Sequence, residues 1–345
     1  MSDFALRLID WQRQYGRHDL PWQGSREPYR VWLSEIMLQQ TQVVTVIPYY
    51  LRFVARFADL PSLARADLDE VLSYWSGLGY YSRARNLHAA AQRVMLDFNG
   101  QFPTELADIV SLPGIGRSTA AAIVVFCFGA RAAILDGNVK RVLTRQFGVI
   151  GFPGQPSVAA SLWQLAEALL PVTENSIYTQ ALMDLGATRC KRSRPNCGQC
   201  PVAASCVALA TRQIAILPTP KAKKTIPQKT TCFVILHHAG RVWLKQRPLT
   251  GIWGGLWSFP ELNVSDDVLG MCRDDWQLSV RAVRTGPSFR HVFTHFGLTI
   301  TPYWVEVTEL PLLVAESGGW WVKPDEALTA GIPAPVRKLL SQWQG

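Results

Sequence analysis

The stretch from Ser111 to Phe126, SLPGIGRSTAAAIVVF, decides the fold of the first part of the chain. Pro113, Gly114 and Gly116 form a tight turn, and an apolar helix is predicted to begin near Ser118. Glycines let the backbone approach a ligand closely, and the exposed amides of a helix N-terminus bind phosphate oxygens. An ordinary turn fits the same pattern, so the stretch predicts a helical hairpin and leaves phosphate binding open.

Length and composition set the class of protein. The chain has 345 residues, of which 48% are hydrophobic and 18% are charged, and this excludes both a small stapled scaffold and a disordered chain. The length favours two domains. The formal charge of +9 suits a polyanionic partner such as a nucleic acid, although a surplus kept only for solubility gives the same balance.

The spacing of apolar residues divides the chain into two parts. From Leu6 to about Ala215 it is mostly helical, which predicts an all-α domain over residues 1–216. Residues 217–229, LPTPKAKKTIPQK, are typical of an exposed linker. Beyond them, TCFVILHHAGRVWLKQR and HVFTHFGLTITPYWVEV alternate like strands around a His-Ala-Gly turn and around Gly297, which predicts an α+β domain over residues 230–345.

Neither export nor a membrane span is predicted. The first residues, MSDFALRLIDWQRQYGRHDLPW, lack the uninterrupted apolar core of a signal peptide. The longest apolar run, Ala120 to Ala130, is shorter than the roughly 20 residues that a membrane-spanning helix needs. We therefore expect a cytoplasmic location.

Four of the seven cysteines lie in one short segment, CKRSRPNCGQCPVAASC: Cys190, Cys197, Cys200 and Cys206. Because disulfides do not persist in a reducing compartment, this cluster predicts a metal centre. Structural zinc is usually bound by two CxxC pairs, whereas this segment has one CxxC and two longer arms, so an iron–sulfur cluster is favoured over zinc. The other three lie apart and are predicted to be ordinary packing residues: Cys127, Cys232 and Cys272.

The segment between the first two of these cysteines is basic. It contains Lys191, Arg192 and Arg194, and Arg189 precedes it. A metal centre that fixes the loop makes it a rigid basic projection suited to phosphates. A solvated charge run is the alternative interpretation.

Glu35 lies in the strongly apolar segment VWLSEIMLQQTQVVTVI. A poorly hydrated carboxyl group has a raised pKa, which suits a side chain that donates a proton at physiological pH. The alternative is that Glu35 reaches solvent or pairs with an arginine.

Asp136 precedes the helical segment GNVKRVL, in the position of a helix N-cap. There the carboxylate accepts amide hydrogen bonds and is favoured by the helix dipole, so we expect its pKa to be low. Capping alone accounts for an aspartate at this position.

Several separated motifs, in this order, resemble those of the helix-hairpin-helix DNA glycosylases related to endonuclease III, and among them the adenine DNA glycosylases of the MutY type. They are SEIMLQQTQV, GLGYYSRARNLH, LPGIGRSTAAAI, LDGNVKRVL, the four-cysteine segment and a Nudix-like carboxyl-terminal region. The resemblance covers nearly the whole chain. It implies a multidomain protein in which the six-helix hairpin part takes about residues 28–135 and the iron–sulfur part residues 1–27 and 136–216.

The resemblance also implies the chemistry. Glu35 protonates an extruded adenine at N7, Asp136 stabilises the positive charge on the sugar, and water completes the hydrolysis. The four cysteines of the segment bind a 4Fe-4S cluster. Ser118 stands where related lyases carry a nucleophilic lysine, so simple hydrolysis is expected, and Lys140 is a candidate for an incidental Schiff base.

The expected partner is double-stranded DNA with adenine opposite 8-oxoguanine or guanine, bound by a monomer in the nucleoid if the source is bacterial. The resemblance places Gln40 and Tyr80 as wedges, Gln180 at the adenine edge and Asn138 beside the catalytic aspartate. Arg83 and Arg85 favour a DNA-facing turn around Tyr80. The predicted DNA and substrate contacts are Gln40, Tyr80, Arg83, Arg85, Gly114, Gly116, Ser118, Asn138, Gln180, Phe293, Thr294 and His295.

The last three of these residues belong to the Nudix-like region, which by resemblance recognises 8-oxoguanine. Many relatives have serine at the position of Thr294, and an alternating strand explains Phe293 and His295 equally well. The segment GLWSFPELNVSDDVLGMCRDDWQL lacks the acidic pattern that binds magnesium in Nudix hydrolases, so pyrophosphatase activity is not expected.

Two other functions fit parts of the sequence. A bifunctional glycosylase-lyase acting on oxidised pyrimidines is disfavoured by Ser118 and by the extra domain. A non-catalytic DNA-binding protein whose iron–sulfur centre senses redox state is disfavoured by the two carboxylates.

Overall fold

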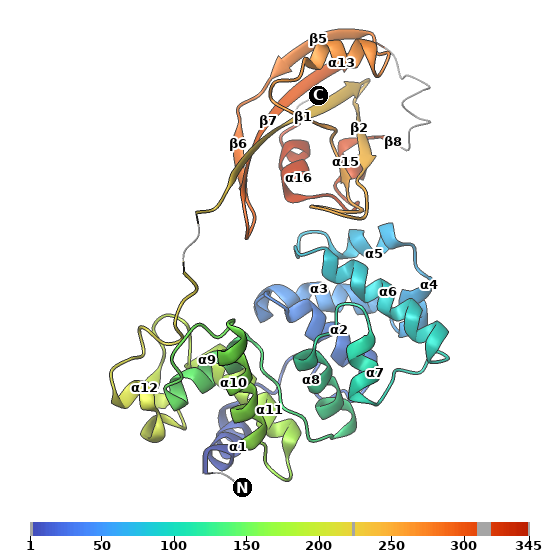
Figure 1. Cartoon of the computed structure of the whole chain (residues 1–345). Coiled ribbons are helices and arrows are strands. Elements are labelled where there is room, and N and C mark those ends of the chain that lie inside the picture. The colour runs from blue at the N-terminus through green and yellow to red at the C-terminus, as the bar shows by residue number, and fades with distance from the viewer. Residues whose placement is uncertain (1–2, 223–224, 309–318, 344–345) are drawn as a thin grey trace. The chain divides into compact units, whose positions relative to one another are not determined.

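The computed structural model describes residues 3–222, 225–308 and 319–343 (Figure 1). The chain forms two compact units: Met1–Arg65 with Asn86–Lys223, and Ala66–Arg85 with Lys224–Gly345. Residues 223–224 of the predicted linker lie outside the described residues. The domain limits predicted from the sequence remain a prediction.

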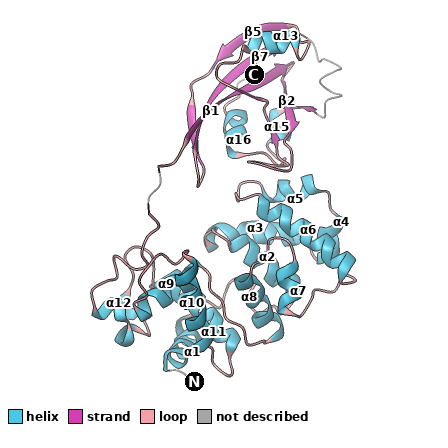
Figure 2. Cartoon of the chain, viewed as in Figure 1, coloured by secondary structure: helices cyan, strands magenta, loops and turns pink. Residues whose placement is uncertain are grey.

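Unit 1 is helical, as predicted, and the strands all lie after residue 227 in the described parts of the chain (Figure 2). A π-helical turn, Leu185–Arg189, follows the last long helix, and the cysteine segment has only short 3-10 turns. The helices of this unit are α1 (Asp3–Tyr15), α2 (Pro28–Leu38), α3 (Val43–Arg56), α4 (Leu60–Arg65), most of α6 (Ser82–Asp97), α7 (Leu106–Ser111), α8 (Arg117–Phe128), α9 (Gly137–Phe147), α10 (Pro156–Ala168), α11 (Asn175–Asp184) and α12 (Val207–Ala210).

One core of unit 1 joins the amino-terminal helix to the helices that follow the hairpin. Leu8 of α1, Leu143 of α9 and Leu162 of α10 are all fully buried in it. Burying such side chains stabilises the fold by roughly 1.5–3 kcal/mol each. The core therefore holds α1 against elements that lie more than a hundred residues later in the chain.

Unit 2 combines α5 (Leu68–Trp75) with a mixed sheet in the order β3-β2-β1-β7-β5. The Tyr81 hydroxyl donates to the carbonyl of Ile332 (3.2 Å), and Arg337 donates to Ser76 Oγ (2.9 Å). The remaining elements are β1 (Gln228–His238), β2 (Arg241–Gln246), β3 (Trp257–Ser258), β4 (Glu261–Leu262), α13 (Val268–Asp274), β5 (Val280–Thr285), β6 (Phe289–Val292), β7 (Gly297–Val307), β8 (Gly319–Val322), α15 (Pro324–Ala327) and α16 (Ala334–Ser341).

The two predicted hairpins are present, with one difference. β1 and β2 turn at Ala239 and Gly240, as expected from the sequence. β6 pairs with β7 in the register Val292↔Gly297, so Gly297 begins a strand and the turn comprises residues 293–296. The prediction of a turn at Gly297 was wrong because the short β6 ends before the glycine. β1 and β7 run parallel and form the centre of the sheet.

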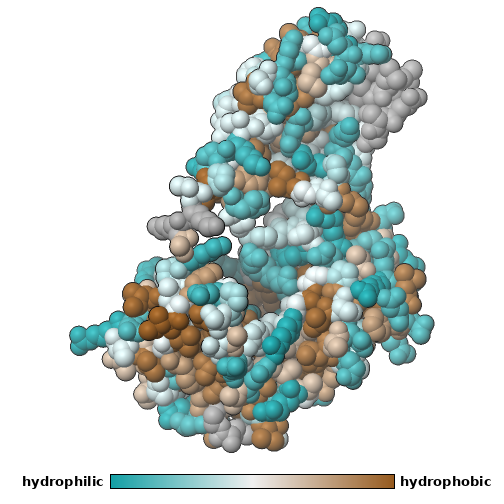
Figure 3. Space-filling view, in the orientation of Figure 1, coloured by the Kyte–Doolittle hydropathy of each residue, from teal (hydrophilic) through white to brown (hydrophobic). Residues whose placement is uncertain are grey.

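Hydrophobic residues reach the surface in small groups among hydrophilic ones on the face seen in Figure 3. No helix among the described residues is long and apolar enough to cross a bilayer.

Candidate active site

Glu35 lies in the second half of α2, which Pro28 begins and a break at Gln39–Gln42 ends. Its neighbours Trp32 and Ile36 are buried in the protein interior. Loss of hydration in this apolar setting raises the pKa of the Glu35 carboxyl to about 8. The side chain is therefore mostly protonated at neutral pH, as a general acid must be.

Asp136 is the N-cap of α9, where its Oδ1 accepts a hydrogen bond from the backbone amide of Val139 (2.7 Å). Its pKa, however, is raised and not lowered. Burial outweighs the amide hydrogen bonds from Val139 and Asn138 and the positive charges of Arg141 and Lys140. The expectation of a low pKa for Asp136 was wrong, because it took account of the helix cap but not of the burial of the carboxyl group.

The fold brings these two carboxyl groups together. The negative charge of Asp136 is the second cause, after burial, of the raised pKa of Glu35. Because two nearby carboxylates disfavour each other's ionisation, the pair favours one protonated and one ionised group. This division of roles is what glycosidic bond cleavage requires.

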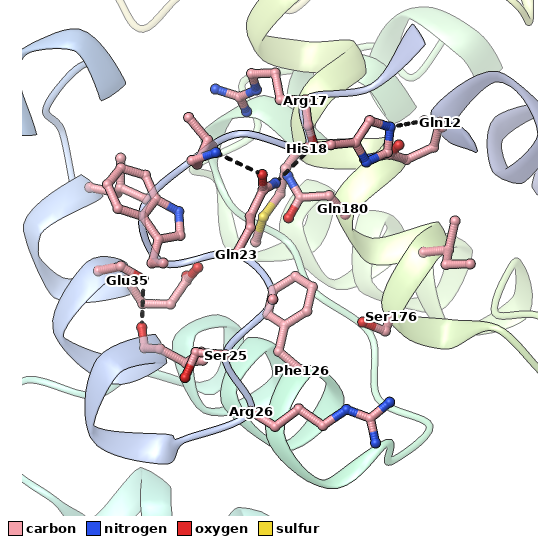
Figure 4. A pocket seen from close by; sticks show the side chains of 18 of the residues that line it. Gln12, Arg17, His18, Gln23, Ser25, Arg26, Glu35, Phe126, Ser176 and Gln180 are labelled. Atoms are coloured by element: carbon pink, nitrogen blue, oxygen red, sulfur yellow. Dashed lines mark hydrogen bonds between the residues drawn. The ribbon is translucent and has the colours of Figure 1, made fainter. Parts of the chain in front are cut away.

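A cavity of about 580 Å³ lies beside Glu35 within unit 1 (Figure 4). Phe126 of α8 and Gln180 of α11 also line it, together with Trp22 from the loop after α1. Its lining includes three cationic side chains, Arg13, Arg17 and Arg26, and the imidazole of His18. The cavity combines a proton donor, aromatic surface and positive charge, which suits a planar base attached to a phosphate chain.

Asp184, at the end of α11, fixes several of the residues that line this cavity. Its buried carboxylate accepts hydrogen bonds from Gln12 Nε2 (3.0 Å), from Gln180 Nε2 (2.9 Å) and from the backbone amide of Arg17 (2.8 Å). It also pairs with the Arg17 guanidinium at 2.6 Å. Since a carboxylate only accepts, Gln180 presents its Nε2 to Asp184 and keeps Oε1 for a bound molecule.

Sequence reasoning missed the loop from Gly16 to Glu27, which supplies much of the lining. It treated residues 1–27 only as part of the iron–sulfur region. The mixture of Arg17, His18, Trp22 and Arg26 in one short Pro- and Gly-containing segment was an available signal for an anionic aromatic ligand. Asp184 was also missed, because nothing local marks a buried carboxylate.

The hairpin is formed as predicted by α7, a turn and α8. Gly114 has a φ of +77°, and a Cβ there would lie 2.7 Å from Asn86 Cβ, so this position requires glycine. Gly116 is exposed, with open space around it. Ser118 Oγ accepts a hydrogen bond from the amide of Leu135 (3.0 Å), which connects the hairpin to the residue before Asp136.

Asn138 links the start of α9 to the cysteine segment. Its Oδ1 accepts a hydrogen bond from Arg141 Nη2 (2.8 Å), and Arg141 Nε donates to the carbonyl of Cys190 (2.7 Å). A Cβ at Gly186 would lie 2.5 Å from Asn138 Cβ, so glycine is needed for this close packing. Asn138 therefore positions the backbone beside Asp136.

The four cysteines of the segment line one small cavity, and all of them are free thiols. Within the ranges that the structure describes, no three His, Cys, Asp or Glu side chains converge on a point where they could hold a single metal ion. Four cysteine sulfurs around one small cavity are a ligand set that both iron–sulfur clusters and structural zinc use. Cys127, Cys232 and Cys272 do not line this cavity.

Comparisons with known proteins agree with this geometry. An adenine DNA glycosylase of Buchnera aphidicola is 36% identical over 98% of this chain and 96% of its own length. The mouse and human adenine DNA glycosylases are each 31% identical over the whole of this chain, which covers 78% and 74% of their lengths. The chain belongs to the adenine DNA glycosylase family.

Domain and structure comparisons support this family assignment. Residues 33–168 match the HhH-GPD superfamily of base excision DNA repair proteins, and residues 231–342 match the NUDIX domain. A thermostable thymine-DNA glycosylase is 29% identical, with a TM-score of 0.55 over 60% of this chain and 95% of its own. An endonuclease III in a non-covalent DNA complex, 23% identical over 61% of this chain and 94% of its own, has a TM-score of 0.53 and shows the fold alone.

The two residues proposed as wedges, Gln40 and Tyr80, are both exposed and both have a strained backbone conformation. Gln40 in unit 1 has a φ of +58°, and Tyr80 in unit 2 has a φ of +49° with 42% of its surface exposed. Left-handed backbone is uncommon outside glycine and is concentrated at functional positions.

The prediction that Arg83 faces DNA was wrong, whereas the DNA contact of Arg85 stays a prediction. Arg83 is buried, lies against the rings of Trp75 and Tyr80, and donates to the carbonyl of Gly79 (3.1 Å). Arg85 is half-buried and donates to the carbonyl of Gly254 (2.7 Å). Arg83 therefore supports the Tyr80 turn, whereas Arg85 connects the start of α6 to the loop between β2 and β3.

In the NUDIX region, Phe293, Thr294 and His295 form the turn between β6 and β7. Thr294 and His295 are exposed, whereas Phe293 is half-buried. The amide of Phe293 donates to the carbonyl of Phe296 (2.8 Å), which closes the turn. The Thr294 hydroxyl is therefore presented at the tip of a tight hairpin.

Proposed function

We propose that this chain is a monofunctional glycosylase that hydrolyses the N-glycosidic bond of adenine opposite 8-oxoguanine or guanine in double-stranded DNA. The reaction is the first step of base excision repair. The observation that carries the proposal is the position of Glu35 at the wall of the cavity, where burial and the nearby Asp136 raise its pKa to about 8. Family membership supplies adenine as the base.

Adenine reaches the cavity only after extrusion from the helix, at a cost of a few kcal/mol. Gln180 Oε1 accepts a hydrogen bond from the exocyclic amine of adenine, since Asp184 fixes Gln180 Nε2. Arg26 attracts the neighbouring phosphates. Gln40 and Tyr80 fill the gap left in the duplex.

Cleavage follows from the two carboxyl groups. Glu35 gives its proton to N7, the electrons of the C1′–N9 bond move onto the base, and Asp136 stabilises the cationic sugar. A water molecule adds at C1′ and returns a proton to Glu35. The products are free adenine and an abasic site.

No lyase step is required of this chain. Ser118 occupies the place of the nucleophilic lysine of related lyases, and a hydroxyl forms no Schiff base with the sugar. Lys140, one turn beyond Asp136, traps the opened sugar only incidentally. Borohydride trapping should therefore disappear in Lys140→Ala while adenine release continues; trapping that persists would point to another amine.

The four cysteines of the segment hold a 4Fe-4S cluster. Such a cluster supplies rigidity to the exposed loop from Lys191 to Arg194, whose charges then contact DNA phosphates. The hairpin amides around Gly114 and Gly116 form a second phosphate contact. The enzyme acts as a monomer on chromosomal DNA, which in a bacterium is in the cytoplasm.

The carboxyl-terminal region recognises 8-oxoguanine opposite the target adenine. The exposed Thr294 hydroxyl and the His295 ring offer donors and acceptors to the base edge. The Phe293 ring precedes these two residues and contacts the His295 ring.

Single-turnover excision from a duplex with adenine opposite 8-oxoguanine tests the proposal. Wild type should release adenine and give strand breaks only after alkali. Glu35→Gln should be slower by about 10² to 10⁴ or more while still binding the duplex. Near wild-type rates in Glu35→Gln, or breaks before alkali, would refute the assignment. A duplex with an oxidised pyrimidine is the control for the lyase alternative.

A further inference from the structure

Trp253 lies in the loop between β2 and β3, in a backbone conformation that its side chain does not favour. Its φ is +55°, although only 8% of its surface is exposed. A bulky residue in the left-handed region is strained, and such strain persists only where the surroundings impose it. The loop therefore places this indole at one particular point.

The Trp253 indole contacts the body of the domain. The ring of Phe233, a fully buried residue of β1, lies 6.2 Å away between centroids. The Arg247 guanidinium lies 5.7 Å from the indole centroid and donates to the carbonyl of Ile252 (3.1 Å). Arg247 is itself paired with Glu261 at 2.5 Å. These neighbours therefore restrain the position of the Trp253 indole.

The Trp253 indole also contacts aromatic rings of the hairpin formed by β6 and β7. The Phe293 ring lies 5.2 Å from it and the His291 ring 5.7 Å from it. Phe293 stacks in turn on Phe296 (4.5 Å). Phe293 is therefore held between Trp253 and Phe296, immediately before the exposed Thr294.

We propose that Trp253 is a positioning residue for recognition of the base opposite adenine. Trp253 is fixed by the domain core and restrains the Phe293 ring. The restrained ring in turn fixes the position of the Thr294 hydroxyl at the tip of the turn. Trp253 itself does not touch DNA in this proposal. The inference rests on the proposed function, because it presupposes that Thr294 meets 8-oxoguanine.

The test compares single-turnover excision from duplexes with adenine opposite 8-oxoguanine and opposite guanine, in the full-length protein. Trp253→Leu should lower the preference for 8-oxoguanine about tenfold, a change of about 1.4 kcal/mol, and leave the rate opposite guanine within about twofold. Trp253→Phe should restore most of the preference, because it keeps an aromatic face. Trp320→Leu is the matched control: Trp320 contacts Trp257 (5.4 Å) in β3.

A spectroscopic measurement separates positioning from loss of folding. In proton NMR spectra, the His291 and His295 ring signals should shift in Trp253→Leu and stay in place in Trp320→Leu, while the His237 signal is unchanged in both. Equal loss opposite both bases, or an unchanged preference with shifted signals, would overturn the inference. A wild type that shows no preference for 8-oxoguanine would instead contradict the proposed function.

Discussion

Glu35→Gln should stabilise the protein at the same time as it slows adenine release. The carboxyl has a pKa of about 8 in the folded chain and 4.5 as a free side chain. Above pH 4.5 the unfolded chain loses this proton while the folded chain keeps it, so the wild type loses stability as the pH rises from 4.5 to 8. Glutamine does not titrate, so the variant does not lose stability in this way as the pH rises.

The size of this gain follows from the two pKa values. Each pH unit between them is worth about 1.36 kcal/mol, so the advantage of Glu35→Gln in unfolding free energy should be about 1 kcal/mol at pH 5 and about 4 kcal/mol at pH 8. The gain should level off above pH 8, where both states of the wild type are ionised.

Urea unfolding followed by circular dichroism, at pH 5 and at pH 8, measures this difference. Glu105→Gln is the control, because Glu105 is an exposed glutamate at the start of α7, and its change should stay within about 0.5 kcal/mol at both pH values. A gain for Glu35→Gln that is the same at both pH values, or larger at pH 5, would refute the reasoning. Glu35 would then be ionised in the folded protein.

Three further outcomes are expected. The single-turnover rate of wild type should fall about tenfold per pH unit above pH 8, because Glu35 loses its proton there; a rate that keeps rising to pH 10 would contradict its role as the acid. Asp184→Asn should lower the unfolding free energy by about 3–5 kcal/mol, since it breaks the buried pair with Arg17, and should slow adenine release; urea unfolding and excision assays that match wild type would exclude this role. Cys200→Ser should lower the iron content below the about four atoms per chain expected of wild type in a colorimetric iron assay, and an unchanged content would remove Cys200 from the ligand set.

Local signals in the sequence predicted the parts of the fold that depend on short segments. The hairpin follows from Pro113, Gly114 and Gly116, and the N-cap of α9 follows from an aspartate before a helical pattern. The apolar neighbours of Glu35 along a helix indicated a desolvated carboxyl, but they left a solvent-exposed or arginine-paired side chain open, and the family resemblance decided for the acid. Each of these depends on residues within one or two helical turns.

Burial imposed by distant segments was not predictable in the same way. The N-cap position of Asp136 was correct, but its pKa is raised, because the surrounding fold removes water from it. Arg83 looked like a DNA-facing cation, yet its guanidinium is buried against Trp75 and Tyr80. Asp184 and Arg17 meet only in the folded chain, so no pattern in either segment indicated their pairing.

The pairing of α1 with α11 has a consequence for synthesis on the ribosome. Gln12 and Arg17 are made first, but their partner Asp184 is added more than 160 residues later. Until that residue leaves the ribosome, the amino-terminal loop cannot close over Glu35. A nascent chain therefore completes its hairpin early and the cavity beside Glu35 late, so translation products that end before Asp184 lack the contacts that fix the cavity wall.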